Sequence, residues 1–326
     1  MRKNRKRLKK ILISIVLILW AGVAVYGFKQ TDAGSSMSGN KTVTIGYQKG
    51  DPFDIAKQRG EFSKKMEKKG YSVVFKQFQD GNALMQALQS GSIDYGRTGD
   101  TPPVSALSSG TKLTYIAAGD SKAKGSAVLT KKGSGISSMK DLKGKKVAYA
   151  KGTTSQYMLL AALKKAGMSA DDVTWVNMSQ SSASAAFTKG KIDGWATWDP
   201  YTAQAQLTQN AKTVMNGVGI SNNRDYVLSL RSYAKDNKEV SKYLTKYLDE
   251  DMKWANNNHS DLIKMMSKSL KLSESVVKKM VNRRSYGVSE MSSKYVKEEQ
   301  KIANLFYSEG FIKNKVNINE TGDYDK

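Results

Sequence analysis

The sequence predicts an α/β protein built on largely parallel sheets, and three observations lead to this class. From Thr42 onward, short apolar runs alternate with helical segments, which is typical of parallel sheets covered by helices. The chain has 326 residues, which is enough for two domains with substantial cores. Its 39% hydrophobic residues and 4 prolines exclude a mainly disordered chain and a multi-span membrane protein.

The expected elements follow one another in a regular order. Short apolar runs predict strands, and the segments between them predict helices. Gly167 is expected to end the helix at 155–165. In chain order these are strand 42–47, helix 55–68, strand 72–78, helix 82–89, strands 113–118, 127–130 and 146–150, and helix 155–165. After about Lys235 the strand pattern stops. Helices are expected at 240–256, 262–269, 275–281 and 292–307, followed by a polar tail.

An internal repeat indicates two equivalent lobes. Gly91-Ser92-Ile93-Asp94 and Gly190-Lys191-Ile192-Asp193 each follow a helical segment and precede a short strand. Nine residues after each glycine stands an aspartate, Asp100 or Asp199, with a proline close behind it. Because proline is tolerated in the first turn of a helix, both segments predict a strand whose carboxyl end opens into a helix. Ligands bind at such ends in open α/β sheets.

The N-terminal residues predict export. Seven lysines and arginines precede an apolar stretch of 18 residues, Ile11 to Phe28. The stretch is longer than the core of a usual signal peptide and just long enough to span a membrane, so residues 1–28 are a signal or a membrane anchor. Thr31-Asp32-Ala33 is an imperfect cleavage site, which favours the anchor and leaves removal open. Both alternatives place the rest outside the cytoplasm, after a flexible linker at residues 29–40.

Charge and composition exclude several kinds of site. The formal charge is +24, but beyond the N-terminal run the lysines are spread as pairs without a nucleic-acid-binding motif. We interpret them as solvated faces and expect no nucleic-acid partner. The chain has no cysteine and one histidine, His259, in a polar run that predicts a surface loop. Disulfides and zinc–thiolate sites are therefore excluded, and no catalytic residue, metal or cofactor is expected.

One strand-to-helix segment is a candidate anion site. Thr153, Thr154 and Ser155 follow a strand and Gly152, and they bring hydroxyl groups next to the unpaired backbone N–H groups of a helix start. The alternative is an ordinary helix cap, because serine and threonine are favoured at that position in any case.

Two tryptophans and an arginine flank the other candidate segments. Trp195 and Trp198 point to opposite faces of an extended segment, so one is expected in the core and the other at a cleft. Trp198 is preferred for the cleft because Asp199 and a proline follow it at the turn. Arg97 could pair with a bound anion, but it alternates with Thr98 along its strand, so a surface or structural arginine is preferred.

Four ordered runs carry a resemblance to a known family. They are GYQKG at 46–50, GSIDYGRTGDTPPV at 91–104, DLKGKKVAYAKGTTSQY at 141–157 and GKIDGWATWDPY at 190–201. With these runs the chain resembles the solute-binding proteins of aliphatic sulfonate importers, which belong with the nitrate- and taurine-binding proteins of ABC transporters. The resemblance implies a two-lobed type II periplasmic-binding fold with a helical C-terminal region.

The resemblance also implies lobe limits and ligand-binding residues. Lobe I would comprise 41–124 plus 222–315, lobe II 125–221, and 316–326 would be the polar tail. Aspartate stands at position 100, where the family's T-G-E stretch usually has glutamate. The implied ligand-binding residues are Gln48, Thr98, Gly99, Asp100, Thr153, Thr154, Ser155, Trp198 and Asp199.

The implied function is that of an extracytoplasmic, monomeric solute-binding protein. It would capture an aliphatic sulfonate by closure of two lobes and deliver it to an ABC permease coupled to a cytoplasmic ATPase. Other ligands on the same fold remain alternatives: another small anion, a taurine-like compound or a thiamine precursor. Two other classes are an enzyme resembling the pyrimidine-synthesis proteins of thiamine formation and a cationic surface adhesion protein.

Overall fold

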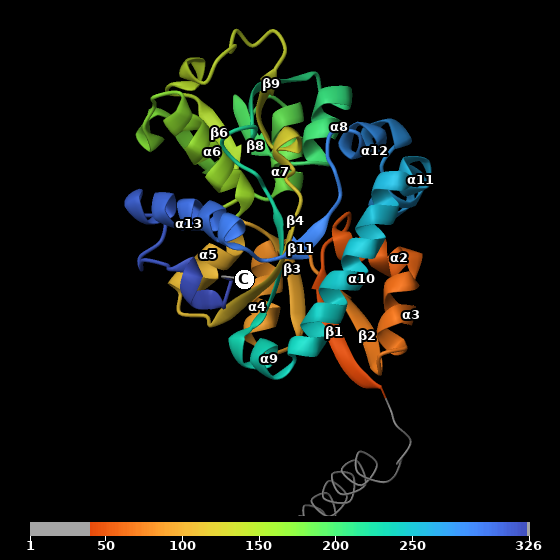
Figure 1. The fold of residues 1–326 in the computed structure, drawn as a ribbon. Helices are drawn as coiled ribbons and strands as arrows, with labels where there is room; N and C mark the ends of the chain where they lie inside the picture. Colours follow the sequence, from red (N-terminus) through yellow and green to blue (C-terminus); the bar gives the residue numbers. More distant parts are fainter. Residues whose placement is uncertain (1–39, 325–326) are drawn as a thin grey trace, which may run out of the picture. The chain divides into compact units, whose positions relative to one another are not determined.

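A computed structural model of the protein describes residues 40–324, and these residues form two β-sheets flanked by helices (Figure 1). The first sheet has six strands in the order β11-β4-β10-β3-β1-β2, and the second has five in the order β7-β6-β8-β5-β9. The predicted α/β class is confirmed. The predicted leader 1–28 and the linker 29–40, apart from Asn40, lie outside the described residues.

The two sheets take their strands from different parts of the chain. The first sheet contains β1 (Lys41–Tyr47), β2 (Tyr71–Gln77), β3 (Tyr95–Gly99), β4 (Leu113–Gly119), β10 (Asp225–Leu230) and β11 (Val288–Glu290). The second contains β5 (Ala127–Lys131), β6 (Lys146–Tyr149), β7 (Thr174–Asn177), β8 (Gly194–Thr197) and β9 (Ala211–Asn216). The chain therefore passes between the sheets twice, after β4 and after β9. The lobe limits expected from the resemblance stay a prediction.

Both sheets combine parallel and antiparallel pairs, so the strand directions are more mixed than expected. β3 is parallel to β1 and antiparallel to β10, and β8 is parallel to β6 and antiparallel to β5. β5 and β10 are the first strands after the two passages between the sheets. A strand that enters from the other sheet needs no crossover helix, so it can run antiparallel to its neighbours.

The internal repeat occupies equivalent places in the two sheets. Before β3, the Asp94 carboxylate accepts a hydrogen bond from the Thr44 N–H at 2.7 Å, and the Asp94 N–H donates to the Thr44 carbonyl at 2.8 Å. Before β8, Asp193 makes the same two bonds with Lys146, both at 2.9 Å. Each aspartate thus ties the start of its strand to the parallel neighbour, which supports the equivalence of the two halves.

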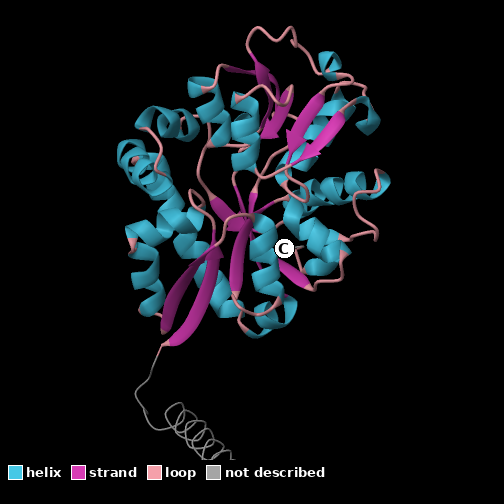
Figure 2. Cartoon of the chain, turned by 180° about the vertical axis from the view of Figure 1, so that it is seen from behind, coloured by secondary structure: helices cyan, strands magenta, loops and turns pink. Residues whose placement is uncertain are grey.

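The helices cover the sheets on both faces (Figure 2). They are α2 (Pro52–Arg59), α3 (Glu61–Glu67), α4 (Gly81–Gln89), α5 (Thr101–Ser108), α6 (Thr154–Lys165), α7 (Gln180–Thr188), α8 (Tyr201–Thr208), α9 (Arg231–Asp236), α10 (Lys238–Asn257), α11 (His259–Leu270), α12 (Glu274–Val281) and α13 (Ser293–Ser308). The single helix predicted at 55–68 is two helices, because Gly60 adopts a left-handed φ of 75° that ends α2. None of the described helices is long and apolar enough to cross a membrane.

The structure corrects three predictions for the C-terminal third. A short strand, β11, pairs with β4 where no strand was expected, since three residues are too few to form a recognisable pattern. His259 begins α11 instead of lying in a loop. The predicted polar tail packs against the fold through Ile318, which is 0% exposed, and Tyr324, whose hydroxyl accepts a hydrogen bond from the Tyr115 N–H at 3.1 Å.

Helices α13 and α12 connect the two sheet layers at different places (Figure 1). At α13, the rings of Phe306 and Tyr157 of α6 have centroids 6.2 Å apart, and Glu309 forms an ion pair with Lys164 at 2.6 Å. α12 lies beside α8, which follows the second sheet. The space between the sheets is therefore bordered by helix contacts on two sides.

Candidate ligand-binding site

A cavity of about 700 Å³ lies between the carboxyl ends of the two sheets. Six strands contribute to its wall, either through their last residue or through the residue that follows it. These strands are β1, β2, β3, β6, β7 and β8. In open α/β sheets the carboxyl ends of parallel strands share one edge, where the loops to the following helices meet. The fold therefore concentrates loop residues from both sheets around one space.

Six helices of the described chain begin at this cavity. The lining residues at or beside these starts are Asp51 (α2), Gly81 (α4), Pro102 (α5), Thr154 (α6), Gln180 (α7) and Tyr201 (α8). Each start leaves backbone N–H groups without partners inside the helix and carries the positive end of the helix dipole. Their convergence makes the cavity favourable for an anion.

The start of α6 offers backbone donors more than hydroxyl groups. The Thr153 hydroxyl donates to the Ala150 carbonyl at 2.8 Å, and the Thr154 hydroxyl donates to Asp100 at 2.7 Å. The Ser155 hydroxyl accepts from the Ala150 N–H at 2.8 Å. By contrast, the N–H groups of Thr153 and Thr154 have no hydrogen-bond partner among the described residues.

The structure places the three residues of the predicted cradle differently. Thr153 and Thr154 line the cavity, whereas Ser155 is 0% exposed and does not. The reason is that a side chain at the second helical position points back toward the preceding strand, where Ser155 finds Ala150. Ser155 bonds the turn after β6 and does not face the cavity, while its role toward a ligand stays a prediction.

The end of β3 contributes Thr98 and Gly99 to the cavity wall, and Asp100 lies behind them. Thr98 Oγ1 is buried and has no hydrogen-bond partner among the described residues. A Cβ atom on Gly99 would lie 2.7 Å from Thr154 Oγ1, so glycine lets β3 and α6 approach each other. Asp100 accepts hydrogen bonds from Thr154 and Thr101, and burial raises its pKa.

Gln48 lines the cavity after β1. Its backbone N–H donates to the Asp51 carboxylate at 2.8 Å, and its carbonyl accepts from the Asp51 N–H at 3.2 Å. These bonds form the turn that starts α2. The Gln48 side-chain amide has no hydrogen-bond partner in the part of the chain that the structure describes.

Trp198 and Asp199 follow β8 and line the cavity, while Trp195 is 0% exposed in the core. The Asp199 carboxylate accepts from the Ala203 N–H at 3.0 Å and pairs with Arg283 Nε at 3.1 Å. Burial raises the pKa of Asp199 to about 6. Gly125 leaves room for this carboxylate, because a Cβ atom there would lie 2.4 Å from Asp199 Oδ2.

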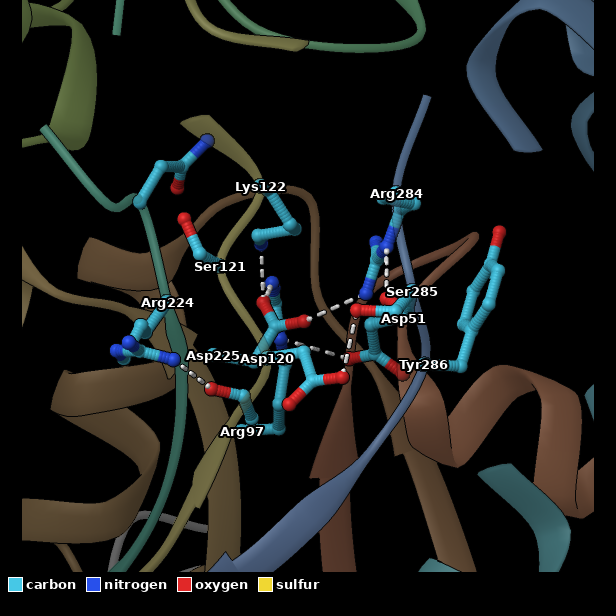
Figure 3. Close-up of polar contacts among 12 residues, drawn as sticks. Asp51, Arg97, Asp120, Ser121, Lys122, Arg224, Asp225, Arg284, Ser285 and Tyr286 are labelled. Atoms are coloured by element: carbon cyan, nitrogen blue, oxygen red, sulfur yellow. Dashed lines mark hydrogen bonds and ion pairs between the residues drawn. The ribbon is translucent and has the colours of Figure 1, made fainter. Parts of the chain in front are cut away.

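Sequence reasoning missed a cation cluster in the cavity wall, formed by Arg97, which is buried, and by Lys122 and Arg284, which are partly buried (Figure 3). All three side chains contact Asp225, with Arg284 Nη2 at 3.6 Å from Oδ2. Arg97 is 7% exposed, so it is not a surface arginine; its side chain pairs with Asp225 and also lines the cavity. The signal available in the sequence was the scarcity of arginine, because lysines greatly outnumber arginines. Three of the six arginines in residues 40–324 line the cavity.

The charges around the cavity favour an anion. Six cationic side chains line it, namely Lys49, Arg97, Lys122, Lys151, Arg283 and Arg284, against three carboxylates, Asp51, Asp80 and Asp199. Each carboxylate is already engaged: Asp51 by two backbone N–H groups at 2.8 Å, Asp80 by the Ala83 N–H at 2.9 Å, and Asp199 by Arg283. The described residues contain no group of three or more His, Cys, Asp or Glu side chains placed to hold a metal ion.

Comparisons with known proteins agree with this geometry. The family model described as NMT1/THI5 like matches residues 52–260. A protein of Escherichia coli (strain K12), provisionally named an aliphatic sulfonates-binding protein, is 30% identical over 292 residues, 89% of this chain and 91% of the relative. A Bacillus subtilis protein with the same name is 26% identical over 96% of this chain and 93% of its own length.

The chain is also similar to solved structures of sulfonate-binding proteins. The periplasmic aliphatic sulphonate binding protein of Escherichia coli superposes with a TM-score of 0.81 at 29% identity, covering 86% of this chain and 97% of that one. The alkanesulfonate-binding protein of Xanthomonas axonopodis, solved bound to MOPS, has the same score, identity and coverage. The expected periplasmic-binding fold is confirmed. A desulfurization enzyme, at 12% identity and a TM-score of 0.64, shares the fold alone.

Proposed function

The chain belongs to the NMT1/THI5-like family, and from the names of its relatives we propose that it is an exported binding protein that captures an aliphatic sulfonate and delivers it to an ABC permease. The relatives that cover most of its length are named for sulfonate binding, and none of those names states catalysis. The desulfurization enzyme resembles the chain in fold only, so it does not support an enzymatic function.

The observation that carries the proposal is the convergence of six helix starts and six cationic side chains on a cavity whose three carboxylates are engaged. A sulfonate keeps its negative charge at physiological pH and has three oxygens that accept hydrogen bonds. Each hydrogen bond to a charged group contributes about 1.5 to 3 kcal/mol. The cavity supplies such donors, and the three carboxylates that line it already have hydrogen-bond or ion-pair partners.

We assign the sulfonate group to the space between the start of α6 and the end of β3. The N–H groups of Thr153 and Thr154 and the hydroxyl of Thr98 are the donors there without protein partners among the described residues. Gln48 and Gly99 complete this part of the wall. Asp100 acts indirectly, because it orients the Thr154 hydroxyl.

The alkyl chain is assigned to the apolar part of the wall. Trp198, Leu270, Leu272 and Met280 line the cavity and offer surface that an alkyl chain can cover. Covering apolar surface contributes roughly 25 cal/mol per Å². Asp199 stays paired with Arg283 in this arrangement and keeps the loop after β8 in place.

We propose that capture proceeds by closure of two lobes. Lobe I comprises residues 41–124 plus 222–315, and lobe II comprises residues 125–221. The strands of the first sheet fall within the first set of residues and those of the second sheet within the other, which supports these limits. The segments between them, 122–125 and 219–222, would act as the hinge. Since lining residues come from both sets, a ligand would contact both lobes at once.

Calorimetry with the full-length chain in detergent tests the function. Ethanesulfonate should bind, and binding should persist after EDTA treatment because no metal takes part. Thermal unfolding gives a second measurement, since a ligand at 100 times its dissociation constant stabilises a protein by about 2.7 kcal/mol. Nitrate, taurine and a thiamine precursor serve as competing ligands. Binding of nitrate or the thiamine precursor with no binding of any sulfonate would refute the sulfonate assignment. Binding of taurine alone would favour the taurine-like alternative over an alkanesulfonate.

The location and partners follow from the names of the relatives and from the N-terminal sequence. The solved Escherichia coli relative is periplasmic, which supports export. We propose that Ile11 to Phe28 holds the monomeric protein at the outer face of the membrane, next to its permease. The protein should then stay with membranes at high salt. A mature chain beginning near Gly34 in the soluble fraction would indicate a cleaved signal instead.

A further inference from the structure

The cavity has two different kinds of anion-binding group. One is the start of α6, where the N–H groups of Thr153 and Thr154 have no partner among the described residues. The other is the cation cluster, which consists of three side chains and lies on the wall formed by the first sheet and the segment after α12. One sulfonate group can be held by the first set alone, so the second set needs an explanation.

The cation cluster has more cations than carboxylates in contact with it. Asp225 is shared by all three side chains, and Asp51 is the other acid in contact, 3.8 Å from Arg97 Nε. Arg97 Nε is buried without a hydrogen-bond partner among the described residues. A buried charge with an incomplete set of partners is costly. The cluster borders a cavity, so an anion in that cavity would relieve the cost.

Three further acids near the cluster do not complete it. Asp199 is paired with Arg283, and Asp120 accepts a hydrogen bond from the Ser285 hydroxyl at 2.7 Å. Asp100 lies close enough to affect Lys122 electrostatically, but its carboxylate accepts hydrogen bonds from the hydroxyls of Thr154 and Thr101, and burial raises its pKa. Burial, together with the guanidinium groups of Arg97 and Arg284, lowers the pKa of Lys122. A bound anion would oppose this effect and favour the ammonium form of Lys122.

The two anion-binding groups are close enough for a small ligand to reach both. Gly99 pairs with Asp225 across the antiparallel strands β3 and β10, where paired Cα atoms lie about 4.5 to 5.5 Å apart. On its other side, a Cβ atom on Gly99 would lie 2.7 Å from Thr154 Oγ1. In space, the cluster and the start of α6 are therefore separated by about the width of one residue, Gly99.

We propose that the ligand of this protein carries a second acidic group, with its sulfonate at the start of α6 and a carboxylate at the cation cluster. The substrate class is a short sulfocarboxylate. This inference rests on the proposed function, because it specifies the ligand of the same cavity. Lys122 and Arg284 determine the preference, since they line the cavity and share Asp225 with Arg97.

The test compares sulfoacetate with ethanesulfonate, which have the same sulfur–carbon–carbon skeleton and differ in the carboxylate. Calorimetry with the full-length protein, at one pH and ionic strength, should give an affinity for sulfoacetate that is about tenfold higher or more, the effect of one charge-assisted hydrogen bond. Arg284→Gln and Lys122→Met should each bring the ratio of the two affinities close to one. Lys124→Gln, an exposed neighbour on the same segment that does not line the cavity, should leave the ratio unchanged.

The outcomes distinguish a failure of this inference from a failure of the proposed sulfonate-binding function. Equal affinities in the wild-type protein would overturn the second acidic group and leave sulfonate binding intact. No binding of either compound would overturn the proposed function and this inference with it. A preference that persists in both folded variants would overturn the role of the cluster. The wild-type comparison needs no variant, so the inference stays testable if a variant fails to fold.

Discussion

Arg283 Nε lies 3.1 Å from Asp199 Oδ2 and so connects the segment after α12 to the loop after β8. The two side chains are 15% and 11% exposed and both line the cavity. They come from residues assigned to different lobes, and the contact lies where α12 meets α8. The ion pair thus links the two halves of the cavity wall and engages a carboxylate that would otherwise repel an anionic ligand.

Asp199→Asn should change how stability depends on pH. Burial raises the pKa of Asp199 from 3.8 to about 6, so between these values the folded protein holds a proton that the unfolded chain has lost. Through this group, the free energy of unfolding falls as pH rises from about 4 to 6, by up to about 3 kcal/mol. Relative to wild type, the asparagine variant should gain stability over that range. Urea unfolding at several pH values measures this.

The exposed Asp236→Asn is the control for that experiment and should leave the pH dependence as it is in the wild type. A stability difference between wild type and Asp199→Asn that is constant from about pH 4 to 7 would show that Asp199 does not titrate as proposed.

Gly125→Ala should destabilise the protein through a collision with Asp199. The added Cβ atom would lie 2.4 Å from Asp199 Oδ2, which is well inside van der Waals contact. We expect a loss of about 1 to 3 kcal/mol in the free energy of unfolding. In an Asp199→Ala background the same substitution should cost less than about 0.5 kcal/mol, because the colliding atoms are gone. A double-mutant cycle measures the coupling, and additive costs would contradict the explanation.

Ser155→Ala should lower stability and leave ligand affinity nearly unchanged. The hydroxyl is buried and accepts a hydrogen bond from the Ala150 N–H, so its removal should cost about 1 to 3 kcal/mol. Because Ser155 does not line the cavity, the affinity for ethanesulfonate should stay within about twofold. Unfolding of the free protein and calorimetry check both parts. A large loss of affinity at full stability would instead restore Ser155 as a ligand contact.

Trp198→Ala should weaken long-chain sulfonates more than methanesulfonate. Trp198 lines the cavity, and only a long alkyl chain loses buried apolar area when the ring is removed, at roughly 25 cal/mol per Å². Calorimetry across a series of alkanesulfonates measures the dependence on chain length. Equal losses along the series would mean that the ring acts on the fold and not on the alkyl chain.

Local sequence patterns predicted much of the fold. The helix expected at 240–256 is α10, Lys238–Asn257, and the strand expected at 113–118 is β4, Leu113–Gly119. These succeed because strand and helix formation depend on neighbouring residues and leave a period in the sequence. The G-x-I-D repeat likewise marks β3 and β8, since each aspartate bonds a backbone that a fixed local turn presents to it.

The tertiary structure alone decided which charged residues meet at the cavity. Arg97, Lys122, Asp225 and Arg284 are far apart in the sequence, and they come together because β10 inserts antiparallel beside β3 while the segment after α12 returns to the same edge. A hydrophobic period records which face of an element is buried and carries no information about which distant side chains share that face. The sequence by itself determined the elements and the family, whereas long-range packing determined the cation cluster and the pairing of Asp199 with Arg283.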